Sequence, residues 1–211
     1  MDVQMITVGP IQENCFLAYE GGRAVIVDPG EEARRLEHAI ASRGLTLEAI
    51  LLTHTHFDHV GAVAPLARAT GAPVYCPEIE VPVLQDIMAF VPWPGFGPFE
   101  SWDPEHTVKG GETLDLAGMT IDVRFTPGHS PGHVTYAVRG ENALFSGDVL
   151  FQGSVGRVDL PGGDWPTLLR SIAALLEEFD DDATVYPGHM GITTLGAERA
   201  SNPFLRELSQ R

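Results

Sequence analysis

Apolar and polar positions along the chain fall into short runs separated by turns that contain Gly or Pro. Runs of strand length predict β-strands at 5–8, 15–20, 24–28, 49–53, 119–125, 133–138, 142–149 and 183–187. The run AILLT at 49–53 is nearly all apolar, which is typical of a strand buried on both faces.

Three other segments carry apolar residues at helical spacing, and they predict helices at 31–44, 58–71 and 164–179. Gly44 and Gly71 are expected to end the first two helices. Asp58 and Asp164 are expected to cap the N-termini of the second and third. Strands and helices alternate in both halves and no low-complexity linker separates them, so we predict one α/β domain over 1–211. The alternation does not specify whether the sheet core has one layer or two.

Residues 87–104 have no clear period and are rich in proline and aromatic residues, which predicts a long surface loop. Its aromatic side chains either pack onto the domain or form a lid or wall for a substrate.

The formal net charge of −16 comes from 29 acidic and 13 basic residues, and Lys109 is the only lysine. An acidic surface repels phosphate backbones, so we expect no nucleic-acid partner. No stretch approaches the roughly 20 apolar residues of a membrane span, and no basic segment followed by an apolar run opens the chain. The cysteines, Cys15 and Cys76, are expected to be free thiols in the cytoplasm. These features favour a small-molecule substrate, and they do not specify an oligomeric state.

Histidines carry the main chemical signal. Of eight histidines, three lie within THTHFDH, directly after the buried strand at 49–53. Residues i and i+2 of an extended strand point to the same side, so His54 and His56 can bind one ion together. Asp58 and His59 add a carboxylate and a third imidazole where the chain turns. One ion takes about four to six ligands, so this density predicts two metal ions.

Three further segments place a potential ligand at the exit of an apolar strand. His129 follows Pro-Gly in TPGHSPGH, His189 follows Pro-Gly in YPGH, and Asp148 follows Ser-Gly in FSGD. Strand exits are where α/β proteins assemble their sites, so we expect these side chains to meet those of THTHFDH.

The motif THTHFDH resembles the T-H-x-H-x-D-H signature of the metallo-β-lactamase superfamily, and PGHSPGH, SGD and PGH resemble its remaining ligand motifs in order. Together with GSVGRVDLPGGD and the tail TTLGAERASNPFL, they are most similar to the short bacterial glyoxalase II-like hydrolases. This resemblance implies an αββα sandwich with two mixed sheets. It also implies two metal positions that share one carboxylate: His54, His56 and His129 bind the first ion, Asp58, His59 and His189 bind the second, and Asp148 bridges both. His133 matches a position that is not a direct ligand.

The resemblance further implies two divalent ions, with zinc the first expectation and iron or manganese the alternatives. They would activate a water molecule as hydroxide, oriented by Asp58, to cleave a thioester such as S-D-lactoylglutathione. We expect the chain to lack the helical C-terminal extension that supplies basic glutathione-binding residues in longer glyoxalase II enzymes. Arg157 is the candidate for binding the glutathione carboxylates, and a structural Arg157–Asp159 pair is the alternative.

Two other activities stay open. A persulfide dioxygenase, which carries a similar G-R-x-D segment, would use one iron ion held by two histidines and Asp148. A hydrolase of another ester or lactone is the other alternative. A lactonase or β-lactamase is less favoured, because class B1 β-lactamases use cysteine at the position of Asp148 and the glyoxalase-like tail points away from both.

Overall fold

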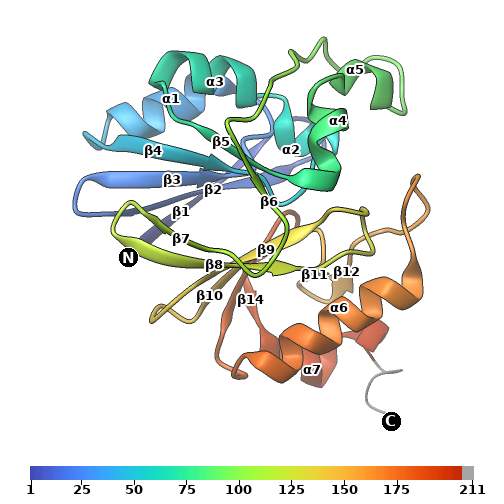
Figure 1. The fold of residues 1–211 in the computed structure, drawn as a ribbon. Coiled ribbons are helices and arrows are strands. Elements are labelled where there is room, and N and C mark those ends of the chain that lie inside the picture. Colours follow the sequence, from blue (N-terminus) through green and yellow to red (C-terminus); the bar gives the residue numbers. More distant parts are fainter. Residues whose placement is uncertain (206–211) are drawn as a thin grey trace.

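Two six-stranded mixed sheets stack against each other in the computed structural model, which describes residues 1–205 (Figure 1). The first sheet has its strands in chain order: β1 Asp2–Val8, β2 Glu13–Glu20, β3 Arg23–Val27, β4 Thr46–Leu51, β5 Val74–Pro77 and β6 His106–Val108. The second has the order β14 Thr193–Thr194, β13 Thr184–Pro187, β10 Ala143–Gly147, β9 Val134–Val138, β8 Met119–Phe125 and β7 Thr113–Leu116. A small hairpin pairs β11 Leu150–Phe151 with β12 Ser154–Val155.

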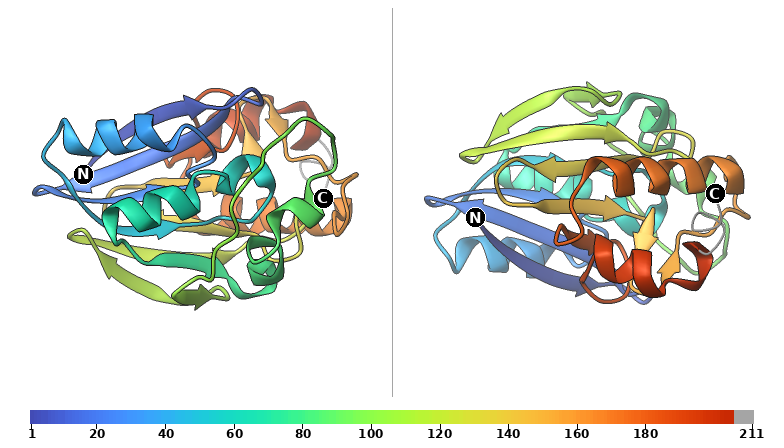
Figure 2. Two further views of the ribbon diagram at one scale, coloured as in Figure 1. Left: turned by 90° about the horizontal axis from the view of Figure 1, so that it is seen from above. Right: turned by 90° about the horizontal axis from the view of Figure 1, so that it is seen from below.

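Helices cover the outer face of each sheet (Figures 1 and 2). The first sheet carries α1 Ala33–Ala41 and α3 Val63–Thr70, and the second carries α6 Trp165–Glu178 and α7 Leu195–Ser201. Shorter helices follow β4 and β5: α2 Phe57–Val60, the 3₁₀-turn η1 Glu78–Glu80, α4 Val81–Leu84 and α5 Ile87–Phe90, and a last 3₁₀-turn is η2 Pro203–Leu205. The layers therefore follow the order αββα, and the predicted fold is confirmed.

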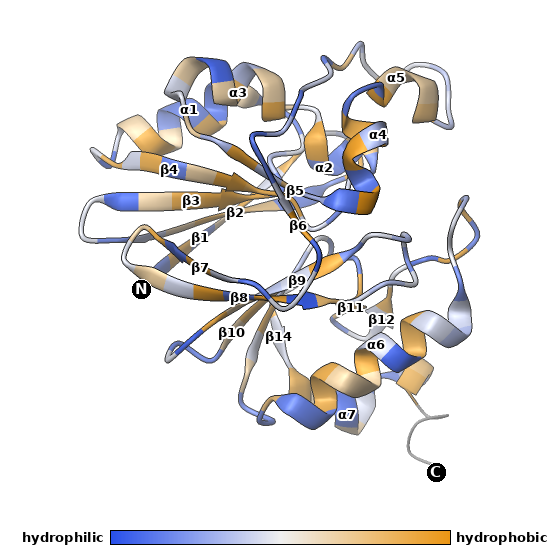
Figure 3. Ribbon diagram, viewed as in Figure 1, coloured by the Kyte–Doolittle hydropathy of each residue, from blue (hydrophilic) through white to orange (hydrophobic). Residues whose placement is uncertain are grey.

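Alternating side chains of the inner strands build three separate apolar layers. In β4, Ala49 and Leu51 face the second sheet, whereas Ile50 packs under α1 and α3. A third layer joins the second sheet to α6 and includes Leu168 and Ile172. Because both faces of β4 are buried, its sequence reads as a continuous apolar run. Figure 3 shows hydrophobic colouring along the central strands and mixed colouring on the helices.

Parallel strand pairs set the position of the loops that matter for function. β4 runs parallel to β3 and β5, and β10 runs parallel to β13. Parallel neighbours end at the same edge of a sheet. The segments after β4, β10 and β13, which carry the predicted ligands, therefore leave the sandwich at a shared edge.

The helix predicted at 58–71 is two helices, and Asp58 does not cap either of them. Asp58 lies inside α2, whose N-cap is His56, and Ala62 begins α3 as its N-cap. A Cβ on Gly61 would lie 2.4 Å from the carbonyl oxygen of Gly30, so the turn after β3 approaches the chain where the two helices meet. This contact redirects the chain, which helical periodicity alone does not reveal.

Other boundaries agree with the pattern more closely. Asp164 caps α6 by accepting a hydrogen bond from the Thr167 backbone N–H at 2.9 Å. Gly71 ends α3 with a left-handed φ of 71°, but α1 ends at Ala41, before the predicted stop at Gly44.

The segment 87–104 is not irregular throughout, because it begins with the short helix α5. Elements of two to four residues, such as β6, β7, α4 and the β11–β12 hairpin, were not predicted because they are shorter than the period that would reveal them. Cys15 and Cys76 are both buried and unpaired within residues 1–205. No helix in that range is long and apolar enough to span a membrane.

Candidate metal centre

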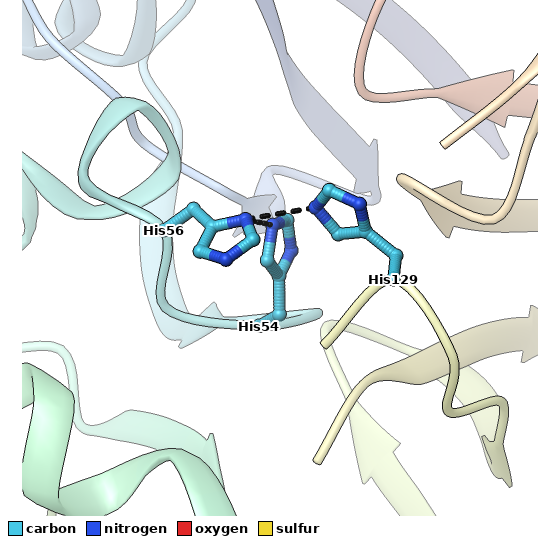
Figure 4. A group of neighbouring side chains, drawn as sticks. All are labelled: His54, His56 and His129. Atoms are coloured by element: carbon cyan, nitrogen blue, oxygen red, sulfur yellow. Dashed lines mark hydrogen bonds between the residues drawn. The ribbon is translucent and has the colours of Figure 1, made fainter. Parts of the chain in front are cut away.

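Three histidine side chains from two loops converge at the shared edge. His54 and His56 follow β4, and His129 follows β8. His56 Nδ1 lies 3.2 Å from His54 Nε2 and 2.8 Å from His129 Nε2 (Figure 4). Two nitrogens on one tetrahedral zinc ion lie about 3.3 Å apart, given Zn–N bonds of about 2.0–2.1 Å. The spacing of this three-His cluster therefore suits one metal ion.

In two of the three rings, a hydrogen bond from the nitrogen that points away from the cluster determines which nitrogen carries the proton. Thr53 Oγ1 donates to Asp28 Oδ2 at 2.6 Å, so it accepts from His54 Nδ1, 3.1 Å away. His129 Nδ1 lies 2.7 Å from the carbonyl oxygen of Arg157, which can only accept. Both rings therefore carry their proton on Nδ1 and direct an Nε2 lone pair into the three-His cluster.

A second group, the Asp58 cluster, contains Asp58, His59 and His189 and lies beside the first. His189 Nε2 is 3.3 Å from Asp58 Oδ2, and His59 Nε2 is 3.9 Å from the same oxygen. His59 Nδ1 donates to Asp28 Oδ2 at 3.1 Å, so Nε2, which faces Asp58, is the nitrogen that would bind a metal ion once its proton is displaced. Such a carboxylate behind a histidine is the usual way to orient a metal-binding imidazole.

Asp148 lies between the two clusters. Its Oδ2 is 3.5 Å from His129 Nε2 and 3.6 Å from His189 Nε2, and its Oδ1 is 3.4 Å from His59 Nε2. Asp148 follows β10 directly, and the adjacent β13 leads to His189. The structure therefore brings the seven predicted ligand side chains together, with Asp148 touching both groups.

His133 is stacked on His54 with ring centroids 4.9 Å apart, but its lone pair is already used. The Asp148 backbone N–H donates to His133 Nε2 at 3.0 Å. His133 Nδ1 then donates to Thr126 Oγ1 at 3.1 Å. With both nitrogens bonded, His133 has no lone pair left for a metal ion, and it holds the backbone of Asp148 instead.

Charges around the two clusters favour a cation. Burial and the neighbouring His129 lower the pKa of His56 to about 3, so this ring is neutral. Burial also opposes a proton on His59, yet Asp148 and Asp58 outweigh it and raise the pKa of His59 well above its usual value. Burial would raise the pKa of Asp148, but His59 and His189 hold it far below its usual range. The negative charge of Asp58 and Asp148 that favours a proton on His59 also favours a metal ion at the same place.

Two buried atoms are consistent with an ion between the groups. His59 Nε2 and Asp148 Oδ1 face each other, and neither has a hydrogen-bond partner among the described residues. Unpartnered buried polar atoms are costly. A cation that accepts lone pairs from both would remove this cost, so the residues present fit a bound metal ion.

Two further carboxyl groups lie behind His59 and were not among the predicted site residues. Asp28 ends the apolar run at 24–28, so the strand-exit rule used for Asp148 could have identified it. Glu13 is 1% exposed and lies 3.8 Å from His59 Nδ1. No local pattern marks Glu13, because its neighbours come from distant parts of the chain.

Arg157, predicted to bind substrate, lies beside the centre but is already paired. Its guanidinium donates twice to the Asp159 carboxylate, at 2.7 Å each, and lies 5.5 Å from the ring centroid of Trp93. The alternative of an Arg157–Asp159 pair is therefore present. The backbone of Arg157 still contributes, through the carbonyl that orients His129.

Aromatic residues of the segment 87–104 pack around Phe57, which lies between the candidate ligands His56 and Asp58. Phe96 and Phe99 are 4.9 and 5.7 Å from Phe57, and Trp93 is 6.1 Å away (ring centroids). Phe96 and Phe99 are half-buried, whereas Trp93 is 40% exposed. Part of the segment thus packs onto the domain, and Trp93 stays exposed beside Arg157.

Two stacked mixed sheets with adjoining His and Asp clusters at one edge define a class of metal-dependent hydrolases. The metallo-beta-lactamase superfamily model matches residues 8–189, and the chain belongs to that superfamily. It is a metallo-hydrolase of this family, and the fold implies divalent metal ions.

Relatives of nearly the same length are similar over the whole chain. A "Hydroxyacylglutathione hydrolase GloC" from Haemophilus influenzae is 37% identical, covering 99% of this chain and 100% of its own. A "Probable metallo-hydrolase YqgX" from Bacillus subtilis shows the same identity and coverage. Among solved structures, "BLEG-1 B3 metallo-beta-lactamase" has a TM-score of 0.92 with 41% identity, covering 97% of this chain and 99% of that one. The structure of "TTHA1623 in a di-iron-bound form" has a TM-score of 0.86 with 42% identity, covering 96% and 100%.

Proposed function

We propose that this chain is a dinuclear thioester hydrolase that acts on an S-2-hydroxyacylglutathione such as S-D-lactoylglutathione. The three-His cluster would hold one divalent ion and the Asp58 cluster a second, with Asp148 as the shared ligand. The observation that carries the proposal is the position of Asp148, whose two oxygens lie within 3.6 Å of nitrogens from both clusters.

A pair of bound divalent ions lowers the pKa of coordinated water and stabilises negative charge on a carbonyl oxygen. The chain supplies the remaining requirements. Asp58 is partly open to solvent, with 14% of its side chain exposed. Burial opposes its ionisation, but His59 and the bond to His189 hold its pKa below the usual value. Asp58 is therefore ionised and can orient an attacking water through its carboxylate oxygens.

The leaving group needs little help from the protein. A thiolate is stable near neutral pH, so a thioester can be cleaved without a strong general acid. An amide or alkyl ester would need more assistance from the site.

Support for a glutathione conjugate comes from the relative named hydroxyacylglutathione hydrolase. Arg157 is the nearby cation identified from the sequence, and to bind a glutathione carboxylate it would have to exchange Asp159 for the substrate. Such an exchange replaces one exposed ion pair by another, so its net cost is small. Trp93 would lie against the same part of the substrate.

A second candidate activity is β-lactam hydrolysis. It is favoured by the 41% identity to a structure titled as a B3 metallo-beta-lactamase, over 97% of this chain. The same two clusters would serve, because ring strain makes the acyl carbon of a β-lactam more open to attack by water than that of an ordinary amide.

One set of measurements separates these activities. Purified protein would be analysed for metal content and assayed with S-D-lactoylglutathione, with a chromogenic cephalosporin, and with glutathione persulfide while oxygen uptake is followed. We expect about two metal ions per chain and release of free glutathione thiol. One iron ion per chain with oxygen consumption would refute the proposal in favour of a persulfide dioxygenase, and cephalosporin cleavage alone would favour the second candidate. Asp122→Asn is the matched control for any Asp variant of the two clusters, because it changes a buried acid that is paired with Arg139 away from the site.

A further inference from the structure

Glu80 is a buried carboxylate that contacts both loops of the three-His cluster. It is 4% exposed and lies in η1. Its Oε2 accepts from Thr55 Oγ1 at 2.8 Å, and its Oε1 accepts from Ser130 Oγ and from the Gly132 backbone N–H, each at 2.7 Å. Thr55 lies between His54 and His56, and Ser130 follows His129.

Burying this carboxylate without a basic partner indicates a specific role. The structure shows no ion pair for Glu80 within residues 1–205, so three hydrogen-bond donors must offset its desolvation. Hydrogen bonds to charged groups are the stronger ones. All three donors lie within three residues of a candidate ligand, so displacing Glu80 would release both loops at once.

Asn14 plays the corresponding part for His189. It is 2% exposed at the start of β2. Its Nδ2 donates to the carbonyls of Pro187 at 3.1 Å and Met190 at 2.9 Å, and its backbone N–H donates to the carbonyl of Gly188 at 2.7 Å. Three of its hydrogen bonds therefore surround His189.

The backbone at His189 needs such support. Met190, the next residue, has a φ of 68°, in the left-handed region that disfavours residues other than glycine. A conformation of this kind costs roughly 1–3 kcal/mol and persists only where its surroundings hold it. Asn14 binds the carbonyl of Met190 itself, and Thr7 Oγ1 fixes the amide by donating to Asn14 Oδ1 at 2.9 Å.

We propose that Glu80 and Asn14 are positioning residues that act on the two metal positions separately. Glu80 sets the three nitrogens of the three-His cluster, and Asn14 sets His189 opposite Asp58 and His59. Both residues reach across the sandwich, because each binds a loop of the second sheet from the first half of the chain. The proposal rests on the metal binding in the proposed function but not on the substrate.

The test compares isosteric and truncating variants by metal affinity. Zinc would be titrated into metal-free protein against a chromophoric chelator, and the histidine ring signals in ¹⁵N NMR would show which cluster fills at each step. We expect Glu80→Ala to weaken the three-His position by about 10–100-fold, the usual effect of removing a residue that supports a ligand. Asn14→Asp, which turns the donor into an acceptor against two carbonyls, should weaken the Asp58 cluster by a similar factor.

Conservative and matched variants make the result decisive. Glu80→Gln keeps an acceptor for Ser130 and Gly132, so it should recover part of the affinity, and it serves if Glu80→Ala does not fold. Glu198→Gln is the control, because Glu198 is 2% exposed and accepts from three donors, Gly153, Thr193 and Asn202, none adjacent to a candidate ligand. It should leave both affinities within about threefold of the wild type.

Equal weakening of both positions by either variant, or no weakening, would overturn this proposal. A wild-type chain that binds two ions but cleaves no thioester would instead refute the proposed function and leave this inference standing. The two failures are therefore distinguishable.

Discussion

Replacing Asp28 by Asn should weaken metal binding by misdirecting histidine lone pairs, although Asp28 is not itself one of the proposed ligands. Asp28 accepts from the Thr53 backbone N–H at 2.7 Å, from Thr53 Oγ1 at 2.6 Å and from His59 Nδ1 at 3.1 Å. An Asn keeps one acceptor for the backbone N–H, but its NH₂ then faces the Thr53 hydroxyl and His59. The amide N–H groups would then face the Thr53 O–H and the His59 Nδ1–H, so that hydrogen-bond donors would point at donors.

The chain can relieve this conflict only by moving protons onto the ligand atoms. If His59 Nδ1 accepts from the new amide, its proton moves to Nε2, the atom that faces Asp148. If the Thr53 hydroxyl accepts from the amide, its own proton loses the Asp28 carboxylate and can turn to His54 Nδ1, which moves the ring proton of His54 onto Nε2. Both metal positions are therefore affected, in contrast to changes at Glu80 or Asn14.

The expected magnitude follows from the bond that is lost. A hydrogen bond to a charged group contributes about 1.5–3 kcal/mol. Since about 1.4 kcal/mol corresponds to a tenfold change in an equilibrium constant, metal affinity should fall by about 10–150-fold. This range agrees with the 10–100-fold effect usually found for residues that orient metal-bound histidines.

Competition of Asp28→Asn with a chromophoric chelator at neutral pH measures this loss directly. Asp122→Asn is the control. Asp122 lies in β8, away from the clusters, where it is 6% exposed and accepts a hydrogen bond from Arg139. Wild-type affinity in Asp28→Asn, with the chain folded by circular dichroism, would refute the assignment of Asp28 as the group that orients His54 and His59.

Three further outcomes are expected. Asp148→Ala should lose both ions and activity while staying folded, as measured by metal analysis, and unchanged metal content would contradict its shared role. Gly188→Ala should also lose metal, because its Cβ would lie 2.3 Å from Asp148 Oδ1, and affinity like that of the wild type would contradict the close approach. Burial lowers the pKa of His54 well below 6.5. Burial also opposes a proton on His59 and on His189, but the neighbouring Asp148 helps to outweigh it, and the pKa of each of these two rings is raised above 6.5. As the pH falls from 8 to 5, protons should therefore displace the ion at the Asp58 cluster before the ion at the three-His cluster. Equilibrium dialysis with histidine NMR measures this order, and simultaneous release of both ions would contradict it.

Local sequence patterns determined the α/β class and the identity of the clustered candidate ligands, whereas the two-sheet αββα layering was implied only by the family resemblance. The AILLT run reports burial on both faces of β4, and the spacing of His54 and His56 reports their common direction. Strand exits at His129, Asp148 and His189 pointed to one edge. Each of these signals lies within a few residues, where a strand period of two or a turn motif is sufficient to reveal it.

Tertiary structure alone decided how the candidate ligands are held. Asn14 meets Met190 across 176 positions of sequence, and Glu80 meets Gly132 across 52. The break at Gly61 also depends on a distant neighbour, Gly30, whereas the Arg157–Asp159 pair was one of two alternatives that the sequence left open and the structure decided between. A hydrogen bond between distant segments leaves no repeat in the sequence, because it needs only one suitable side chain and the fold that brings this side chain to its partner.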